Sequence, residues 1–477
     1  MRRLTGLGTY SMSFTGVVGP LPRGYELLWE RMHEMSPGDP GGSRFTALLT
    51  RGLGGQVDAD ALEKALADVT RRHEMLRMRF KTTGLDPLVE IVEDVEAELH
   101  VEDLRHHPPS ERQALVAHVL YLESVRAFDL VAVPVWRACL LRLSEDYSIL
   151  CVSFPDFLFD AWSDRILVQD LMACYSARLG LSRPPTPVSY GYRDLLNLHE
   201  RQYGGRGPRI QEQVSRLHPL PRPLSIDPRD TAASDLLIDP AAIDFSVSSE
   251  VSARLDDCAT RLRTTQYVVL MAAYYLVVAS VSGSSKVVVS TVTLGRHSKA
   301  ERALVGQFGQ DVFVPVNIDW KGSLEAFVQQ VHRALADARL ARTGYRNLVE
   351  LLGEAHRPRP WSDLHLFDSY FQSVVPESSE SFPGPLRVDH ELEVIPAPLP
   401  GVDEYPRLGD VPSEAMPVWW RQAQPWMLVD SRRQGGTLNF NRTFYDESQV
   451  KGRITSFLEV LRAIADDSGQ PVWKAVG

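Results

Sequence analysis

The spacing of apolar residues predicts helices in several parts of the chain. Leu62, Leu66 and Val69 recur at the helical spacing of three to four residues, and Asp58 or Asp60 precedes them as a helix cap. The strongly apolar segment 267–281 predicts a helix that is buried on most sides. Further amphipathic helices are predicted at 110–125, after a cap at Ser249, at 324–340 and at 449–465.

Continuous apolar runs bounded by turn residues predict strands. The run 147–154 and the run 134–143 before it predict a β-hairpin that turns at 144–146. Further strands are predicted at 45–49, 89–92, 99–101, 287–294, 368–373 and 438–446. Helices and strands are therefore expected in both halves of the chain.

Composition and a Pro- and Gly-rich connecting segment predict two lobes. The chain has 477 residues, of which 44% are hydrophobic and 23% charged, an ordinary globular composition with enough length for two or three cores. Residues 1–19 form a lead-in, 20–185 an N-terminal lobe, 186–240 a connection and 241–477 a C-terminal lobe. The connection is rich in Pro, Arg and Gly, and its arginines fit either a solvated linker or a contact with an acidic partner. Residues 377–406, rich in Pro and acids, are expected to loop over the surface.

Charge and cysteine usage narrow the function classes. The net charge of -10 argues against a nucleic-acid binder, because phosphate contacts need clustered lysine and arginine. The longest apolar segment falls short of the ~20 residues that cross a bilayer, so we expect no membrane span. The cysteines form no C-x-x-C pair and lie in apolar segments, which predicts buried thiols of a cytoplasmic protein and no metal site. They are Cys139, Cys151, Cys174 and Cys258.

The most informative stretch is the corner that follows the apolar run 147–154. The run stops at Pro155, and two acids, Asp156 and Asp160, precede a helix that Trp162 and Ser163 open. A carboxylate in such an apolar setting has to be neutralised, paired or hydrogen-bonded. The corner is therefore a candidate site, and the alternative is a helix cap with one buried ion pair.

This corner resembles the active-site signature His-His-x-x-x-Asp-Gly of the condensation domains of nonribosomal peptide synthetases. Residues 155–161 read Pro-Asp-Phe-Leu-Phe-Asp-Ala, so Asp160 matches the aspartate. Pro155 and Asp156 stand where the family has its two histidines, and Ala161 stands in place of the glycine. The chain is thus similar to a condensation domain with a degenerate signature.

Two more stretches carry the resemblance. Residues 72–80 match the family's Arg-His-Glu-x-Leu-Arg-x-Arg-Phe motif at nearly every position, and the resemblance gives Arg72 and His73 a structural role. Residues 295–296 and 305–308 match its Gly-Arg and Val-Gly-x-Phe segments, whereas Gln310 replaces an asparagine. The similarity runs in the expected order from about residue 21 to 467.

The resemblance implies a fold and an activity. The expected fold is α/β (α+β), with two chloramphenicol-acetyltransferase-like lobes set in a V and a tunnel along their junction. Two acyl or peptidyl carrier proteins would insert phosphopantetheine arms, one carrying an acyl donor and one an amine or hydroxyl acceptor, and acyl transfer would give an amide or ester. No cofactor is expected to be bound beyond the carried arm, and a monomer is expected.

The resemblance also assigns roles to individual residues. Asp160 and Arg296 are expected to pair and to hold the loop in shape. Asp156 occupies the position of the histidine usually credited with catalysis, and burial could raise its pKa enough for it to act as a base. It could instead orient an acceptor ammonium group, or it has drifted in a silent loop. His297 or His365 could replace the missing imidazole, although each fits a surface or packing histidine as well.

The remaining candidates are expected along the tunnel. Pro155 removes a backbone donor and fixes φ, which reshapes the loop. The tunnel and substrate-binding set is Pro155, Phe157, Trp162, Ser163, Gln310, Ser369 and Phe371. Three functions stay open: a free-standing condensation-type enzyme of natural-product biosynthesis that performs acyl transfer or cyclisation, a catalytically silent relative that binds a carrier protein or recruits an enzyme, and a coenzyme-A-dependent acyltransferase.

Overall fold

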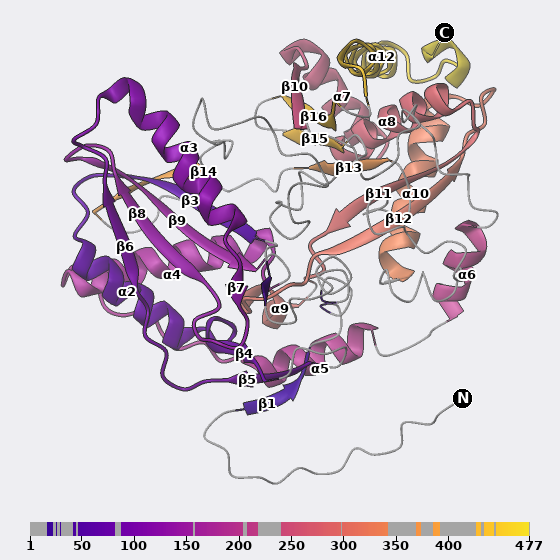
Figure 1. The fold of residues 1–477 in the computed structure, drawn as a ribbon. Coiled ribbons are helices and arrows are strands. Elements are labelled where there is room, and N and C mark those ends of the chain that lie inside the picture. The colour runs from indigo at the N-terminus through magenta and orange to yellow at the C-terminus, as the bar shows by residue number, and fades with distance from the viewer. Residues whose placement is uncertain are drawn as a thin grey trace.

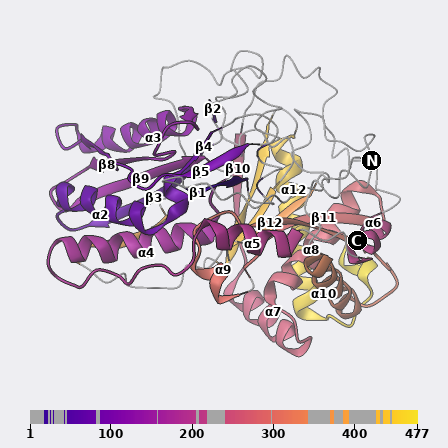
Figure 2. The same cartoon turned by 90° about the horizontal axis from the view of Figure 1, so that it is seen from below.

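The computed structural model describes most of the chain, and the statements below concern the residues it describes. These are residues 17–21, 25, 29, 42–43, 46–81, 87–155, 158–203, 208–217, 240–296, 298–341, 369–373, 385–391, 426–430, 434–442 and 445–476. Two large sheets, each covered by helices, form two lobes that lie side by side (Figures 1 and 2).

The N-terminal lobe is a five-stranded sheet between two helical layers. Its strand order is β14-β3-β9-β8-β6, with β6 parallel to β8 and the other neighbours antiparallel. The strands are β3 (Thr46–Gly54), β6 (Leu99–Asp103), β8 (Arg137–Arg142), β9 (Tyr147–Pro155) and β14 (Arg387–Glu391). Helices α2 (Ala59–Arg72) and α4 (Ala161–Arg178) cover one face, and α3 (Pro109–Val125) covers the other (Figure 2).

Strand β9 shows why its sequence is apolar without alternation. Leu150 and Val152 belong to the core that α2 and α4 cover, whereas Ile149 and Cys151 belong to the core under α3. A strand that is covered on both faces needs apolar residues at successive positions. The predicted hairpin of β8 and β9 is confirmed.

The C-terminal lobe is a six-stranded sheet with the order β10-β16-β15-β13-β11-β12. Its strands are β10 (Pro240–Ser246), β11 (Lys286–Thr293), β12 (Gln310–Asn317), β13 (Tyr370–Ser373), β15 (Trp426–Asp430) and β16 (Gly435–Asn441). One core joins it to α7 (Ser249–Arg261), α8 (Gln266–Ser282), α10 (Leu324–Ala341) and α12 (Glu447–Asp466). Helix α8 is buried along most of its length and ends at Gly283, whose φ of 64° suits glycine.

Smaller elements complete the described part of the chain. Two small sheets contain β1 (Val17–Pro20), β4 (Met78–Phe80), β5 (Leu88–Ile91), β2 (Gly42–Ser43) and β7 (Phe128–Asp129). The short helices are η1 (Glu74–Arg77), α9 (Lys299–Ala303) and η6 (Val472–Ala475). No single described helix has the length and apolar character to span a membrane, although α7 and α8 pass that test together as a pair bent by 105°.

Two expectations about the later half of the chain are wrong. The segment 377–406 is not only loop, because β14 lies within it and pairs with β3 of the N-terminal lobe, Val388 opposite Leu53. The cap of α7 is Ser248 rather than Ser249, because the hydroxyl of Ser248 accepts the N–H of Val251. At α2 the cap is Asp58, one of the two predicted acids.

The predicted connection contains two helices. Helix α5 (Tyr192–Tyr203) buries Tyr192 and Leu195 in the core of the N-terminal lobe, and both views place it between the lobes (Figures 1 and 2). Helix α6 (Pro208–Leu217) belongs to the other lobe, where Arg216 pairs with Asp337 of α10 at 2.5 Å. The chain therefore passes from one lobe to the other between these helices.

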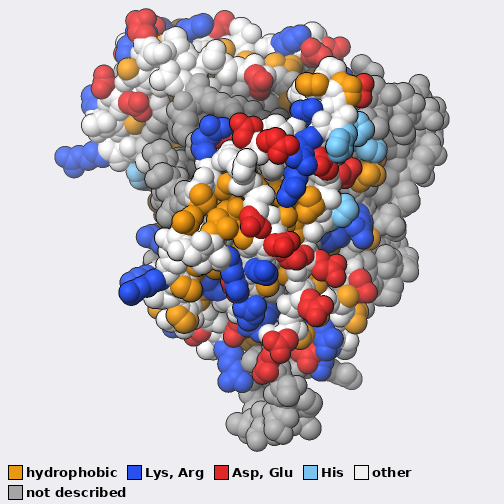
Figure 3. Space-filling model, turned by 90° about the vertical axis from the view of Figure 1, so that its left-hand side faces the viewer, with side chains coloured by type: hydrophobic (Ala, Val, Ile, Leu, Met, Phe, Trp, Pro, Cys, Tyr) orange, Lys and Arg blue, Asp and Glu red, His pale blue; other side chains and the backbone are white. Residues whose placement is uncertain are grey.

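The outer face of the N-terminal lobe carries acidic and basic side chains next to one another, around a central group of hydrophobic side chains (Figure 3). Charges of both signs offset each other's field on such a surface. This face therefore has no extended region of a single charge sign.

The 72–80 motif ties two helices of the N-terminal lobe together. Asp170 of α4 accepts Arg72 Nε at 2.6 Å and lies 2.7 Å from His73 Nε2. Burial acts to raise the pKa of Asp170, but the hydrogen bonds from His73 and Arg72 outweigh it and lower the pKa below its usual value. Arg72 and His73 therefore hold the end of α2 against α4.

Replacing the Asp170 carboxylate tests its contribution to the packing of α2 against α4. Asp170→Asn leaves Arg72 without its partner charge, so we expect the free energy of unfolding to fall by about 2 kcal/mol at pH 7. Because the folded pKa is depressed, the loss should be full above the ordinary aspartate pKa of ~3.9 and should shrink as the pH falls through the folded value. Urea unfolding at pH 7 and at about pH 3 measures both, with exposed Asp256→Asn as control. An equal loss at both pH values would contradict the assignment.

Candidate functional site

The corner after β9 begins helix α4 at the junction of the lobes. Asp160 is the N-cap of α4, and its Oδ1 accepts the N–H of Ser163 at 2.9 Å. A carboxylate is favoured at this position because it satisfies a free N–H and meets the positive end of the helix dipole. Local sequence therefore explains why the helix begins here.

The same carboxylate binds an arginine from the other lobe. Arg296 follows β11, and its Nη2 lies 2.8 Å from Oδ1 and 3.0 Å from Oδ2 of Asp160, while Nε lies 3.2 Å from Oδ2. The two side chains are 1% and 8% exposed. The expected pair is present, and it joins the two lobes.

The other polar groups of the pair are hydrogen-bonded as well. Arg296 Nη1 donates to the carbonyl oxygens of Glu301 and Leu304, and Nη2 also donates to that of Gly306 at 2.9 Å. The guanidinium lies 4.2 Å from the ring centroid of Phe308, whose N–H donates to Asp160 at 3.0 Å. A buried ion pair offsets its desolvation only when its remaining donors and acceptors are satisfied, as they are here.

Gly306 lets the C-terminal lobe approach this corner. Its N–H donates to Ser163 Oγ at 2.9 Å, and its φ is +155°. A Cβ at this position would lie 2.8 Å from the hydroxyl of Tyr25. The glycine of the Val-Gly-x-Phe segment is therefore required by both backbone conformation and close packing.

Further contacts cross the junction. Trp162 Nε1 donates to the carbonyl of Arg302 at 3.0 Å, and the N–H of Gln307 donates to the hydroxyl of Tyr25 at 2.5 Å. The ring of His199 lies 5.7 Å from that of Tyr25 and 5.0 Å from that of Phe308. Sequence analysis missed Tyr25 and His199, and His199 gave no signal because it lies in the segment predicted as a connection.

Several predicted site residues lie outside the described part of the structure. These are Asp156, Phe157, His297 and His365. Pro155 is the last residue of β9, buried and opposite Thr46, and Gln310 is the first residue of β12, opposite Thr293. The roles of Asp156 and His297 therefore stay predictions.

Two residues of the predicted tunnel set are fully buried in the C-terminal lobe. Phe371 is fully buried in the core of the C-terminal lobe, with its ring 5.4 Å from that of Tyr267 and 5.3 Å from that of Tyr274. Ser369 is also fully buried and donates to the carbonyl of Val288 at 2.9 Å. Trp162 and Ser163 lie in the junction. A tunnel role for these four residues stays a prediction.

The part of the chain that the structure describes contains no group of three His, Cys, Asp or Glu side chains able to hold a metal ion. All four cysteines are buried free thiols. Burial raises the pKa of the Cys174 thiol to about 11, which keeps it protonated near neutral pH. These thiols contribute to packing rather than to the junction.

Comparison with known proteins agrees with this geometry. The sequence profile of the family described as Condensation domain matches residues 30–382. Phosphinothricin tripeptide synthetase PhsB of Streptomyces viridochromogenes is 27% identical over 337 residues, which is 67% of this chain but 27% of the synthetase. The chain therefore spans about a quarter of the length of that relative.

Solved structures share the fold. The condensation domain of the Monacolin K polyketide synthase MokA superposes with a TM-score of 0.74 at 16% identity, covering 96% of this chain and 100% of that domain. The X-domain in complex with OxyB from teicoplanin biosynthesis gives a TM-score of 0.70 at 19% identity, covering 98% of each chain. At these identities the likeness concerns the fold alone.

A double-mutant cycle measures the interaction energy of the Asp160–Arg296 ion pair, which we call the clasp between the lobes. Asp160→Asn and Arg296→Gln should each lower the free energy of unfolding by about 3 kcal/mol or more, because each leaves one buried charge without its partner. The double variant should lose clearly less than the sum, since neither charge remains. Chemical unfolding of the four proteins gives the coupling energy, and simple additivity would contradict a direct pair.

Proposed function

Since this chain belongs to the condensation domain family, with a match that covers residues 30–382, we propose that it transfers an acyl group from a carrier-protein phosphopantetheine arm to an amine or hydroxyl acceptor. It is a condensation-domain protein of the nonribosomal peptide synthetase type. The reaction would be amide or ester formation, or the corresponding cyclisation, without the usual catalytic histidine.

The observation that carries this proposal is the intact Asp160–Arg296 clasp. The pair is bidentate, nearly inaccessible to solvent and hydrogen-bonded on all sides. Removing either charge would leave the other buried and unpaired, at a cost of several kcal/mol. The clasp fixes the start of α4, four positions after Asp156 in the sequence, against the C-terminal lobe. The intact ion pair at the start of α4 therefore favours an active site at this corner.

The proposed step balances as an ordinary acyl transfer. The acceptor nitrogen or oxygen attacks the thioester carbonyl, a C–N or C–O bond forms, and the C–S bond to the arm breaks. The acceptor loses one proton to a base, and the departing thiolate of the arm takes up one proton. The protein has to position the two groups and accept that proton, which are contributions of orientation and general base catalysis.

We assign the base or orienting role to Asp156. It immediately follows Pro155, the buried last residue of β9, and apolar residues precede and follow it in the sequence. An aspartate in water is too acidic to be a good base near neutral pH, but an apolar setting raises the pKa of a carboxyl group. A carboxylate can also hold the ammonium form of an amine acceptor before its deprotonation.

Turnover measurements test this role. The protein is incubated with an acyl-loaded and an aminoacyl-loaded carrier protein, and product is followed by mass spectrometry. Asp156→Ala should lower kcat by about a hundredfold or more, the usual contribution of a general base. Asp156→His should retain turnover near neutral pH, and the matched surface carboxylate variant Glu459→Gln should behave as wild type. A loss confined to KM would instead assign Asp156 to acceptor binding. Unchanged kinetics in Asp156→Ala would remove it from the reaction.

A second candidate function is recruitment. The X-domain of teicoplanin biosynthesis, which shares this fold, was solved in complex with the protein OxyB. This chain likewise keeps the fold while Pro155 and Asp156 replace the two histidines of the signature. A catalytically silent chain that binds a carrier protein or a partner enzyme is therefore the alternative.

Binding measured beside turnover separates the two functions. A recruiting protein should bind a loaded carrier with the same affinity in the wild type and in Asp156→Ala, and neither should form product. Isothermal titration calorimetry gives the affinities. Product formed by the wild type and lost in the variant would exclude the recruiting role.

A further inference from the structure

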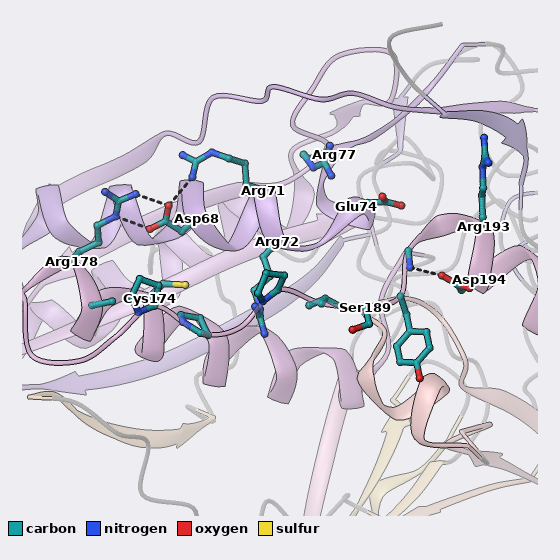
Figure 4. A pocket seen from close by; sticks show the side chains of 17 residues that line it. Asp68, Arg71, Arg72, Glu74, Arg77, Cys174, Arg178, Ser189, Arg193 and Asp194 are labelled. Atoms are coloured by element: carbon teal, nitrogen blue, oxygen red, sulfur yellow. Dashed lines mark hydrogen bonds and ion pairs between the residues drawn. The ribbon is translucent and has the colours of Figure 1, made fainter. Parts of the chain in front are cut away.

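We propose that a pocket in the N-terminal lobe, separate from the junction, binds an organic anion that carries a diphosphate. The pocket lies among α2, η1, the last turns of α4 and the segment 184–194 that leads into α5 (Figure 4). Its volume is about 840 Å³, which suits a molecule the size of a nucleotide. Cys174 on its wall is fourteen residues after Asp160 in sequence, about 20 Å along the helix axis.

Guanidinium groups dominate the polar lining. Five arginines surround the pocket, namely Arg71, Arg72, Arg77, Arg178 and Arg193. One carboxylate, Asp68, serves two of them, since it lies 2.7 Å from Arg71 and 2.5 Å from Arg178 (Figure 4). Burial acts to raise the pKa of Asp68, but these two guanidiniums lower it, so it is ionised near neutral pH. One negative charge is therefore shared between two positive charges.

Two other arginines of the lining, Arg77 and Arg193, form no ion pair with a carboxylate among the described residues. Arg77 donates to the carbonyl oxygens of Val92 and Glu93, which are neutral, and its buried Nε has no hydrogen-bond partner. Arg193 is exposed at the rim, and among the ion pairs of the described residues none involves it. The pocket therefore holds a surplus of positive charge.

The other carboxylates of the lining are already engaged by backbone groups. Glu74 accepts the N–H of Tyr192 at 2.7 Å, and Asp194 accepts that of Gly191 at 2.9 Å. A Cβ at Gly191 would lie 2.4 Å from Glu74 Oε2, so this approach requires glycine. Both carboxylates fix the start of α5, and each adds one negative charge to the lining, which still has more arginines than carboxylates.

The chemistry of the lining selects the ligand. Planar guanidiniums bind phosphate oxygens through paired hydrogen bonds, and a diphosphate supplies several negative charges in one compact group. The segment 184–190 adds prolines and other apolar side chains to the lining: Pro184, Pro185, Pro187, Val188 and Tyr190. These side chains suit the organic part of a nucleotide-like molecule rather than a free inorganic ion.

Calorimetric titration of the full chain tests the proposal. The probes are adenosine 5′-diphosphate, inorganic pyrophosphate and adenosine, each titrated at low and at high salt. Adenosine diphosphate should bind more tightly than pyrophosphate, adenosine should not bind measurably, and added salt should weaken binding. Arg193→Gln should weaken binding of the diphosphate about tenfold, because one charge-assisted contact is lost. The matched control Arg201→Gln, on the same helix but outside the lining, should bind as wild type.

Each result decides the question without carrier proteins, so it is independent of acyl transfer. The exposed side chain of Arg193 makes no hydrogen bond or ion pair with another described residue, so its variant should unfold in denaturant as the wild type does. Equal binding by Arg193→Gln, or no heat with millimolar adenosine diphosphate, would overturn the site. Pyrophosphate binding as tight as that of the nucleotide would overturn the organic part of the proposal.

Discussion

The buried pair of Asp160 and Arg296 is the interaction on which the junction of this protein depends. Each partner comes from a different lobe, and each would be costly to bury alone. The pair is tolerated because the Ser163 side chain and backbone groups of Ser163 and of residues 301–308 supply the remaining hydrogen bonds. Separating the lobes would leave both charges without a partner. The pair therefore contributes more to the specific arrangement of the two lobes than to net stability.

Frame and chemistry are separable at this corner. The clasp fixes the start of α4 through Asp160, whereas the residue that meets a substrate would be Asp156, four positions earlier. Among the described residues, Asp160 and Arg296 contact each other, Ser163, the ring of Phe308 and backbone groups of residues 301–308. A family can therefore keep this frame while the reacting group changes, which is why membership of the family assigns the fold more firmly than the reaction.

Patterns along the sequence predicted the elements whose environment is uniform. Strand β9 is apolar because both of its faces are covered, and α8 because most of its circumference is. Strand β14 could not be predicted in this way. It has five residues in a segment rich in Pro and acids, and its partner β3 lies more than three hundred positions earlier in the chain. Helix α5 was missed for a related reason. Its apolar residues are few, and they are buried in the core of the N-terminal lobe, by residues distant in the sequence.

Helix α5 links the two sites of the molecule. Its first turn is held by Glu74 and Asp194 at the rim of the arginine-lined pocket, and His199, nearly two turns further, lies against Phe308 at the junction. Phe308 in turn lies under the guanidinium of Arg296. A chain of contacts alone does not couple two sites, because coupling requires an element with two packings that each ligand prefers differently. Helix α4 also meets both sites, since Asp160 begins it at the junction and Cys174 and Arg178 line the pocket. Any coupling between the pocket and the junction would therefore require a change in how α4 or α5 packs.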